Sequence, residues 1–162
     1  MSASHDSNAL AEVAAKLEIR DLAARYARGA DHHDGAAVAA LFVPDGVLEV
    51  QHVEGPSRRL EGREAITRAV SSLVRYARTT HFLGQHLIDL QGDRATGEVY
   101  CQAHHLYRTG EGRLNRTVWI RYFDGYVHRD GRWWFSTRRL HADWSEIRPS
   151  PFERGSVPPP AR

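Results

Sequence analysis

Residues 95–143 read ATGEVYCQAHHLYRTGEGRLNRTVWIRYFDGYVHRDGRWWFSTRRLHAD, and three segments of strand length follow one another within them. These segments span residues 95–108, 115–128 and 132–143, and the sequences between them, TGEG at 109–112 and RDG at 129–131, are typical of hairpin turns. A further segment, 81–90, precedes them across the turn sequence QGD at 91–93. The region therefore predicts an antiparallel sheet of three or four long strands.

Helical spacing dominates the chain before this sheet. Residues 9–30 carry apolar side chains three and four positions apart, which predicts a long helix, and a turn is expected at Gly29-Ala30. Asp34 suits the N-cap of a short helix over 36–42 that Pro44 and Gly46 end, a strand is expected over 47–53, and a third helix over 61–75. Helices first and an antiparallel sheet afterwards predict an α+β domain, with the helices covering one face of a curved sheet.

Length and composition agree with a single globular domain. The 162 residues are 41% hydrophobic and 26% charged, which is typical of a chain that buries its own core. We expect residues 1–8 to form a disordered tail, residues 9–147 to form the domain, and residues 148–162, which hold most of the prolines, to form a second tail.

Several classes of function find little support in the composition. A net charge of +2 is too small to indicate nucleic acid as a partner, and no apolar stretch is long enough for a membrane helix. The first residues lack the apolar run of a secretory signal, and Cys101 is the only cysteine, so we expect a cytoplasmic protein. The sequence has no glycine-rich phosphate loop, no Gly-x-Ser-x-Gly elbow and no His-Glu-x-x-His zinc motif.

Strand alternation assigns the sheet residues to two faces. One face of 95–108 carries Val99, Cys101, Ala103 and His105, and one face of 115–128 runs from Val118 to Tyr126. Either set could line an apolar cavity between the sheet and the helices, with a few polar groups in its walls. His81 opens the 81–90 strand, where its side chain is expected at the mouth of that cavity.

Asp31 follows the first helix, where a carboxylate is electrostatically disfavoured because a helix carries partial negative charge at its C-terminus. The residue therefore needs a cationic or hydrogen-bonding partner. A histidine is a natural one, since the carboxylate would fix the tautomer of the imidazole and raise its basicity.

Five segments together resemble a known family. They are Tyr26, the joint ADHHD at 30–34, the strand start THFLG at 80–84, the strand GEVYCQAHH at 97–105, and DGRW at 130–133. This combination resembles the SnoaL-like group of the nuclear-transport-factor-2-like cone folds, which includes scytalone dehydratase, bile acid 7-alpha-dehydratase and hexachlorocyclohexane dehydrochlorinase. The resemblance covers residues 9–145 and implies a cone-shaped, curved antiparallel sheet whose concave face is covered by the N-terminal helices.

The resemblance also implies roles for individual residues. Asp31 and His81 match the aspartate and histidine of the dyad shared by these lyases, in which the histidine removes a proton and the aspartate orients it. Tyr26 matches the tyrosine five residues before the aspartate in bile acid 7-alpha-dehydratase, and His105 matches the second histidine of scytalone dehydratase. Ile120 and Tyr122 stand where scytalone dehydratase has a serine and an asparagine, so the substrate must be held differently.

The remaining candidates concern binding. Ala103, Cys101, Ile120 and Tyr122 are expected to line the substrate cavity, and Arg138 could bind an anionic group there, although a surface position is the simpler expectation for it. No cofactor and no metal are expected. One alternative stays open, because Asp31, His81 and His105 are also the ligand set of a non-haem iron site.

These observations together predict a cofactor-independent lyase, a dehydratase, acting on a small hydrophobic hydroxylated substrate such as a polyketide or steroid. An isomerase or cyclase using the same dyad is the first alternative, and a non-catalytic binding protein of the same fold is the second. A homodimer or homotrimer is also expected, because Trp119 and Phe123 give the outer face of the sheet an apolar area.

Overall fold

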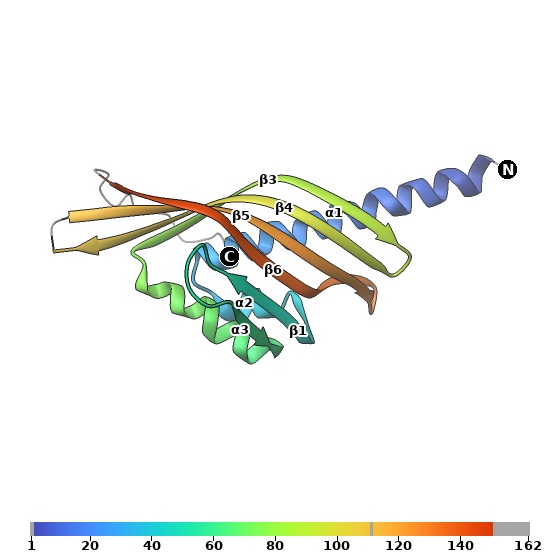
Figure 1. Cartoon of the computed structure of the whole chain (residues 1–162). Coiled ribbons are helices and arrows are strands. Elements are labelled where there is room, and N and C mark those ends of the chain that lie inside the picture. The colour runs from blue at the N-terminus through green and yellow to red at the C-terminus, as the bar shows by residue number, and fades with distance from the viewer. Residues whose placement is uncertain (1, 111, 151–162) are drawn as a thin grey trace, which may run out of the picture.

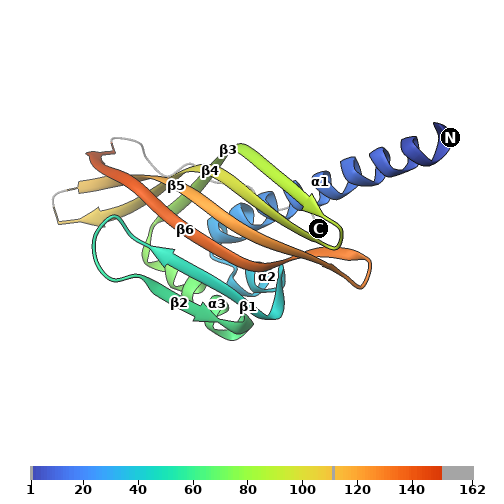
Figure 2. The same cartoon turned by 45° about the vertical axis from the view of Figure 1, so that its right-hand side comes forward.

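The computed structural model describes residues 2–110 and 112–150 and consists of helices on one face of a single sheet (Figures 1 and 2). In chain order the elements are α1 (Ser2–Asp31), α2 (Gly35–Ala39), β1 (Phe42–Gln51), β2 (Arg58–Glu61), α3 (Gly62–Ser71), the single 3₁₀ turn η1 (Ser72–Arg75), β3 (Arg78–Gln91), β4 (Arg94–Thr109), β5 (Gly112–Arg129) and β6 (Arg132–Pro149). The α+β class and the curved sheet of the cone fold are as predicted.

The six strands form one sheet in the order β2-β1-β6-β5-β4-β3. All neighbours are antiparallel except β1 and β6, which run parallel. The four long strands were predicted, whereas β2 and the parallel pairing were not. Hairpin turn sequences report only on strands adjacent in the chain, and the β1–β6 pair joins residues about ninety positions apart, such as Gln51 and His141.

Helix α1 differs from its prediction at both ends. It begins at Ser2, so residues 2–8 are helical rather than a disordered tail, and it continues through Gly29-Ala30 to Asp31 without the expected turn. Residues 2–28 contain neither glycine nor proline, so nothing in them interrupts a helix. At the other end of the chain β6 reaches Pro149, and residues 151–162 of the expected tail lie outside the described residues.

The segment after α1 is a short helix followed at once by a strand. The Asp34 N-cap is confirmed, because its Oδ1 accepts a hydrogen bond from the Ala37 amide at 2.9 Å. The helix ends earlier than predicted, and Pro44 and Gly46, expected as a helix stop, lie within β1. The pairing of β1 with β6 shifts register between Phe42 and Val47, which is how the strand accommodates a proline.

The second half of α1 packs on the concave face of the sheet (Figure 1). Ile19, Ala23 and Tyr26 are buried there in the core cluster, whereas Leu10, Val13 and Leu17 of the same helix are exposed. On the described chain, no helix is both long and apolar enough to cross a membrane.

The opposite, convex face carries a pair of stacked tryptophans. The Trp119 and Trp144 rings lie 3.4 Å apart and nearly parallel, and Trp144 is 49% exposed. Trp119 of the expected apolar area therefore lies in an aromatic stack, whereas the Phe123 ring is contacted by the guanidinium groups of Arg121 and Arg139.

Candidate active site

Asp31, the last residue of α1, contacts His81 near the start of β3. Asp31 Oδ1 lies 2.6 Å from His81 Nδ1, and Asp31 Oδ2 accepts a hydrogen bond from the His81 backbone amide at 3.1 Å. The predicted contact between these two residues is confirmed. The two donors offset the unfavourable position of the carboxylate at the helix C-terminus.

This contact also defines the state of the imidazole. A carboxylate oxygen accepts hydrogen bonds, so Nδ1 is the protonated nitrogen and donates to Asp31, which leaves Nε2 as the nitrogen able to take a proton. The His81 side chain is only 6% exposed. Burial excludes water from the ring and fixes its orientation.

His81 lines a cavity of about 200 Å³ between the helices and the concave face of the sheet. Tyr26 and His105 line the same cavity, whereas Asp31 does not and lies behind His81. The remaining lining residues are mostly apolar; they include Leu48, Val50, Leu60, Leu73, Val118, Ile120 and Leu140. The arrangement is a small apolar chamber with a few polar groups in its walls, as small-molecule sites usually are.

His105 lies beside His81 because of the strand register. Ala103 pairs with His81, so His105, two residues further along β4, projects from the same face. The two rings are 6.0 Å apart between centroids and nearly perpendicular. Burial, and then the neighbouring His81 charge, lower the pKa of His105 to about 4, so its ring is neutral at pH 7.

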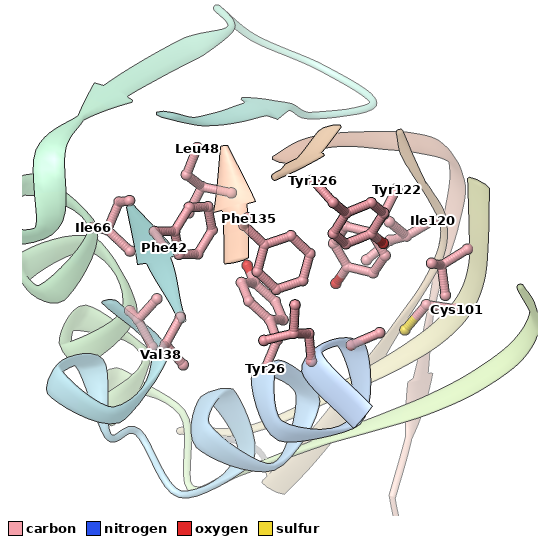
Figure 3. Packing of buried hydrophobic residues seen from close by; sticks show 14 of the residues in the cluster. Tyr26, Val38, Phe42, Leu48, Ile66, Cys101, Ile120, Tyr122, Tyr126 and Phe135 are labelled. Carbon is pink, nitrogen blue, oxygen red and sulfur yellow. The ribbon is translucent and has the colours of Figure 1, made fainter. Parts of the chain in front are cut away.

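Tyr26 reaches from α1 toward the sheet, where its ring lies 6.4 Å from the ring of Phe42 and 6.2 Å from the ring of Phe135, measured between centroids (Figure 3). Its ring also meets Tyr122 edge-on, with 5.8 Å between centroids. Burial raises the pKa of Tyr26 to about 12, an increase that the Arg138 charge partly opposes. The phenol therefore keeps its proton at neutral pH.

The predicted binding residues on the sheet divide into two groups. Tyr122 and Ile120 line the cavity, as expected. Ala103 and Cys101 do not; both face the interior, but their short side chains are buried in the core. Burial raises the pKa of the Cys101 thiol to about 12, so it is not a reactive thiolate.

Arg138 is neither a surface residue nor part of the cavity wall, which corrects both expectations for it. The side chain is fully buried and pairs with Asp124 through two hydrogen bonds of 2.9 Å. Its guanidinium lies 4.0 Å from the centre of the Tyr122 ring. Strand alternation from Phe135 would place Arg138 outside, but the register shift between Gly125 and Tyr126 changes the parity of β6 and turns it inward.

Sequence reasoning missed a second set of cavity residues. They are His52, Arg58, Arg75, Tyr76 and Arg116. They lie just after β1, in the unpredicted β2, at and just after the end of η1, and in β5, and no local sequence pattern indicates that these segments meet.

The iron alternative gains no support from the geometry. Among residues 2–110 and 112–150, no three His, Cys, Asp or Glu side chains are grouped so that they could hold a metal ion. Asp31 is engaged with Nδ1 of His81 instead.

Three solved structures similar to this chain share the fold. A protein of unknown function from Mycobacterium tuberculosis is 27% identical, with a TM-score of 0.69 over 85% of this chain and 75% of that one. A candidate scytalone dehydratase from Novosphingobium aromaticivorans is 25% identical, with a TM-score of 0.69 over 94% and 99%. A hexachlorocyclohexane dehydrochlorinase from Novosphingobium barchaimii is 20% identical, with a TM-score of 0.72 over 92% and 99%.

No curated protein matches the chain. The protein-family model described as the SnoaL-like domain matches residues 11–139, which include most of α1, the residues Tyr26, Asp31, His81 and His105, and most of the sheet. On this match, the chain belongs to the SnoaL-like family.

Proposed function

We propose that the protein is a cofactor-independent lyase, a dehydratase, in which His81 removes a proton from carbon and a neighbouring acid protonates the departing oxygen. The observation that carries the proposal is the Asp31–His81 contact of 2.6 Å at the wall of an apolar cavity. A general base must be oriented and shielded from water, and this pair meets both needs. Family membership and the dehydratase-like neighbours add support.

The reaction balances without a further reactant. The C–H proton moves to Nε2 of His81, the electron pair forms a carbon–carbon double bond, and the neighbouring C–O bond breaks. The oxygen takes a proton from the protein and leaves as water. Asp31 orients His81 and stabilises the imidazolium that forms.

Tyr26 is better suited than His105 to give that proton. Its phenol lines the cavity and holds its proton at neutral pH, with a pKa of about 12. The Arg138 guanidinium, 4.2 Å from the centre of the ring, would stabilise the phenolate left behind. His105, with a pKa of about 4, is not an imidazolium at pH 7 and has no second proton to give.

The volume of the cavity limits which substrates can fit. About 200 Å³ is less than the roughly 300–1,000 Å³ typical of ligand sites, so the enclosed part accepts a compact ring system. A one- or two-ring hydroxylated compound, such as a small polyketide, fits better than a steroid, whose body would extend through the mouth.

The test is proton removal followed in D₂O. Aromatic β-hydroxy ketones such as 4-hydroxy-4-phenylbutan-2-one are incubated with the protein, and NMR follows both deuterium entry next to the carbonyl and formation of the alkene. We expect both with the unaltered chain and a loss of about 10²- to 10⁴-fold in His81→Gln. Exchange without alkene would indicate the isomerase alternative.

The matched control is His128→Gln, which changes an exposed histidine at the far end of β5. It should keep full activity. Undiminished exchange in His81→Gln would contradict the proposal, as would a protein that binds such compounds and never exchanges their protons, since that behaviour belongs to a carrier.

A further inference from the structure

Three arginines and a histidine are among the cavity residues that the sequence did not predict. Arg58 opens β2, Arg75 ends η1, Arg116 lies in β5, and His52 follows β1. Arg58 and Arg75 are exposed, and Arg116 is half-buried. These four residues, called the cationic rim below, share the cavity with His81.

The four residues of the rim line one cavity, and the three arginines act electrostatically on the histidine. Burial lowers the pKa of His52, and the charges of Arg116, Arg58 and Arg75 lower it further. The charges of Arg116 and Arg75 also lower the pKa of His105. The positive field therefore extends from the rim to the catalytic side of the cavity.

No carboxylate balances these charges. The cavity lining contains neither aspartate nor glutamate. Within the described residues, Arg25, Arg59, Arg68, Arg121, Arg138 and Arg148 each form an ion pair with an acidic side chain. No described carboxylate lies within ion-pair distance of Arg58, Arg75 or Arg116, so the positive charges at the cavity are not neutralised by a neighbour.

The side chains of Arg75 and Arg116 have neutral groups as their hydrogen-bond partners within the described chain. Arg116 Nη2 reaches Ser145 Oγ at 3.4 Å, and its buried Nε has no hydrogen-bond partner in the described chain. Arg75 contacts Ser72 Oγ at 3.2 Å and the Tyr76 hydroxyl at 3.3 Å, both neutral groups. A buried donor without a partner is costly, so an incoming acceptor would be stabilised there.

We propose that the cationic rim binds an anionic group of the substrate, a carboxylate or a phosphate, while the apolar body of the substrate enters the chamber toward His81. The placement of the apolar body beside His81 rests on the proposed function. The new element is that the substrate carries a negative charge. Arginine suits this role because its guanidinium binds carboxylate and phosphate oxygens in pairs. An apolar chamber with one charged end selects amphiphilic acids over neutral molecules of the same shape.

The experiment measures binding alone, so it does not depend on turnover. Isothermal titration calorimetry compares 2-naphthoate and 2-naphthyl phosphate with neutral 2-naphthamide. We expect at least one anion to bind about ten-fold or more tightly than the amide, and the better anion identifies which group the rim prefers. Raising the salt concentration should shrink this advantage, because the two outer arginines are screened.

The variants are Arg75→Gln and the double variant Arg58→Gln with Arg75→Gln, which alter exposed side chains and so spare the core. Each should reduce the preference for the anion. In the double variant, the dissociation constants of the anion and the amide should differ by no more than about three-fold. Arg94→Gln removes the same charge from an exposed site at the far end of the sheet and should leave the preference unchanged.

Equal or weaker binding of both anions by the unaltered protein, including no binding of either, would overturn the proposal. Retention of the full preference in the double variant would also overturn it. His81→Gln should keep the preference while losing proton removal, so failure of the rim and failure of the lyase chemistry give different results.

Discussion

The chemistry of the site depends on few side chains, and their environments assign them different roles. The carboxylate of Asp31 is outside the cavity and holds His81 by both its ring and its backbone amide. His81 faces the cavity with one nitrogen left to accept a proton. Asp31 thus orients His81, and His81 reacts, because only the His81 side chain reaches the cavity.

Tyr26 and His105 compete for the role of the acid, and paired variants separate them. Tyr26→Phe removes the hydroxyl and keeps the ring among its aromatic neighbours, so we expect kcat for alkene formation to fall about 10²-fold with little change in stability. His105→Gln should reduce kcat several-fold less. The measurement is kcat on the compound that reacts best in the proton-removal assay.

The opposite order, with His105→Gln the more damaging, would assign the acid role to His105. Deuterium exchange next to the carbonyl serves as the control for both variants. It should persist in Tyr26→Phe, because proton removal by His81 precedes loss of the oxygen.

At the scale of the elements, the site depends on how closely α2 approaches α3. A Cβ placed on Gly35 would lie 2.2 Å from the Thr67 carbonyl oxygen and 2.5 Å from Ser71 Oγ. Because a backbone atom is the first obstacle, the two helices would have to separate. Residues of α3 and η1 line the cavity, so such a shift would reach the site as well.

We therefore expect Gly35→Ala to lower the free energy of unfolding by about 1–3 kcal/mol, measured by urea denaturation. Gly110→Ala is the matched control, because a Cβ at Gly110 meets nothing within 4 Å, and it should change stability by less than about 0.5 kcal/mol. Equal stabilities of the two variants would show that the α2–α3 approach is not tight.

Some helices and strands could be predicted from the sequence and others could not. The long strands β3 to β6 were predictable, because alternation and turn residues are local signals, and so was the Asp34 cap. The contact of Asp31 with His81 followed from a helix-end charge that needs a partner, together with a family resemblance. Strand β2 is only four residues long and carries no such pattern, so the cationic rim that it helps to build was not predicted.

Arg138 shows a different limit of local patterns. Alternation places residues correctly only while the strand is regular, and the bulge in the β5–β6 pair reverses the assignment. The result is a buried ion pair beneath Tyr26 and Tyr122 in place of a surface or binding arginine.

At the scale of the whole molecule, two groups of exposed apolar side chains among the described residues bear on association. One is the convex face around Trp119 and Trp144, and the other is the exposed stripe of Leu10, Val13 and Leu17 on α1. We propose that a second copy of the chain covers the convex face. The stacked Trp119 and Trp144 rings lie on that face with Trp144 half-exposed, and aromatic side chains are enriched in protein interfaces.

Light scattering coupled to size-exclusion chromatography should then give the mass of a dimer or trimer for the unaltered protein. Trp144→Ser should shift the mass toward the monomer, whereas Leu17→Ser, a matched loss of one exposed apolar side chain, should leave it unchanged. A monomer at all concentrations, or dissociation only in Leu17→Ser, would contradict the use of the convex face.

The central claim is that Asp31 holds His81 in one tautomer with Nε2 free to act as a base, and ¹⁵N NMR of histidine-labelled protein tests it without any substrate. At a pH where His81 is neutral, the account predicts a protonated Nδ1 and an unprotonated Nε2 for this residue, and loss of that preference in Asp31→Ala. A His81 ring protonated on Nε2, or one whose tautomer is unchanged in Asp31→Ala, would contradict the account.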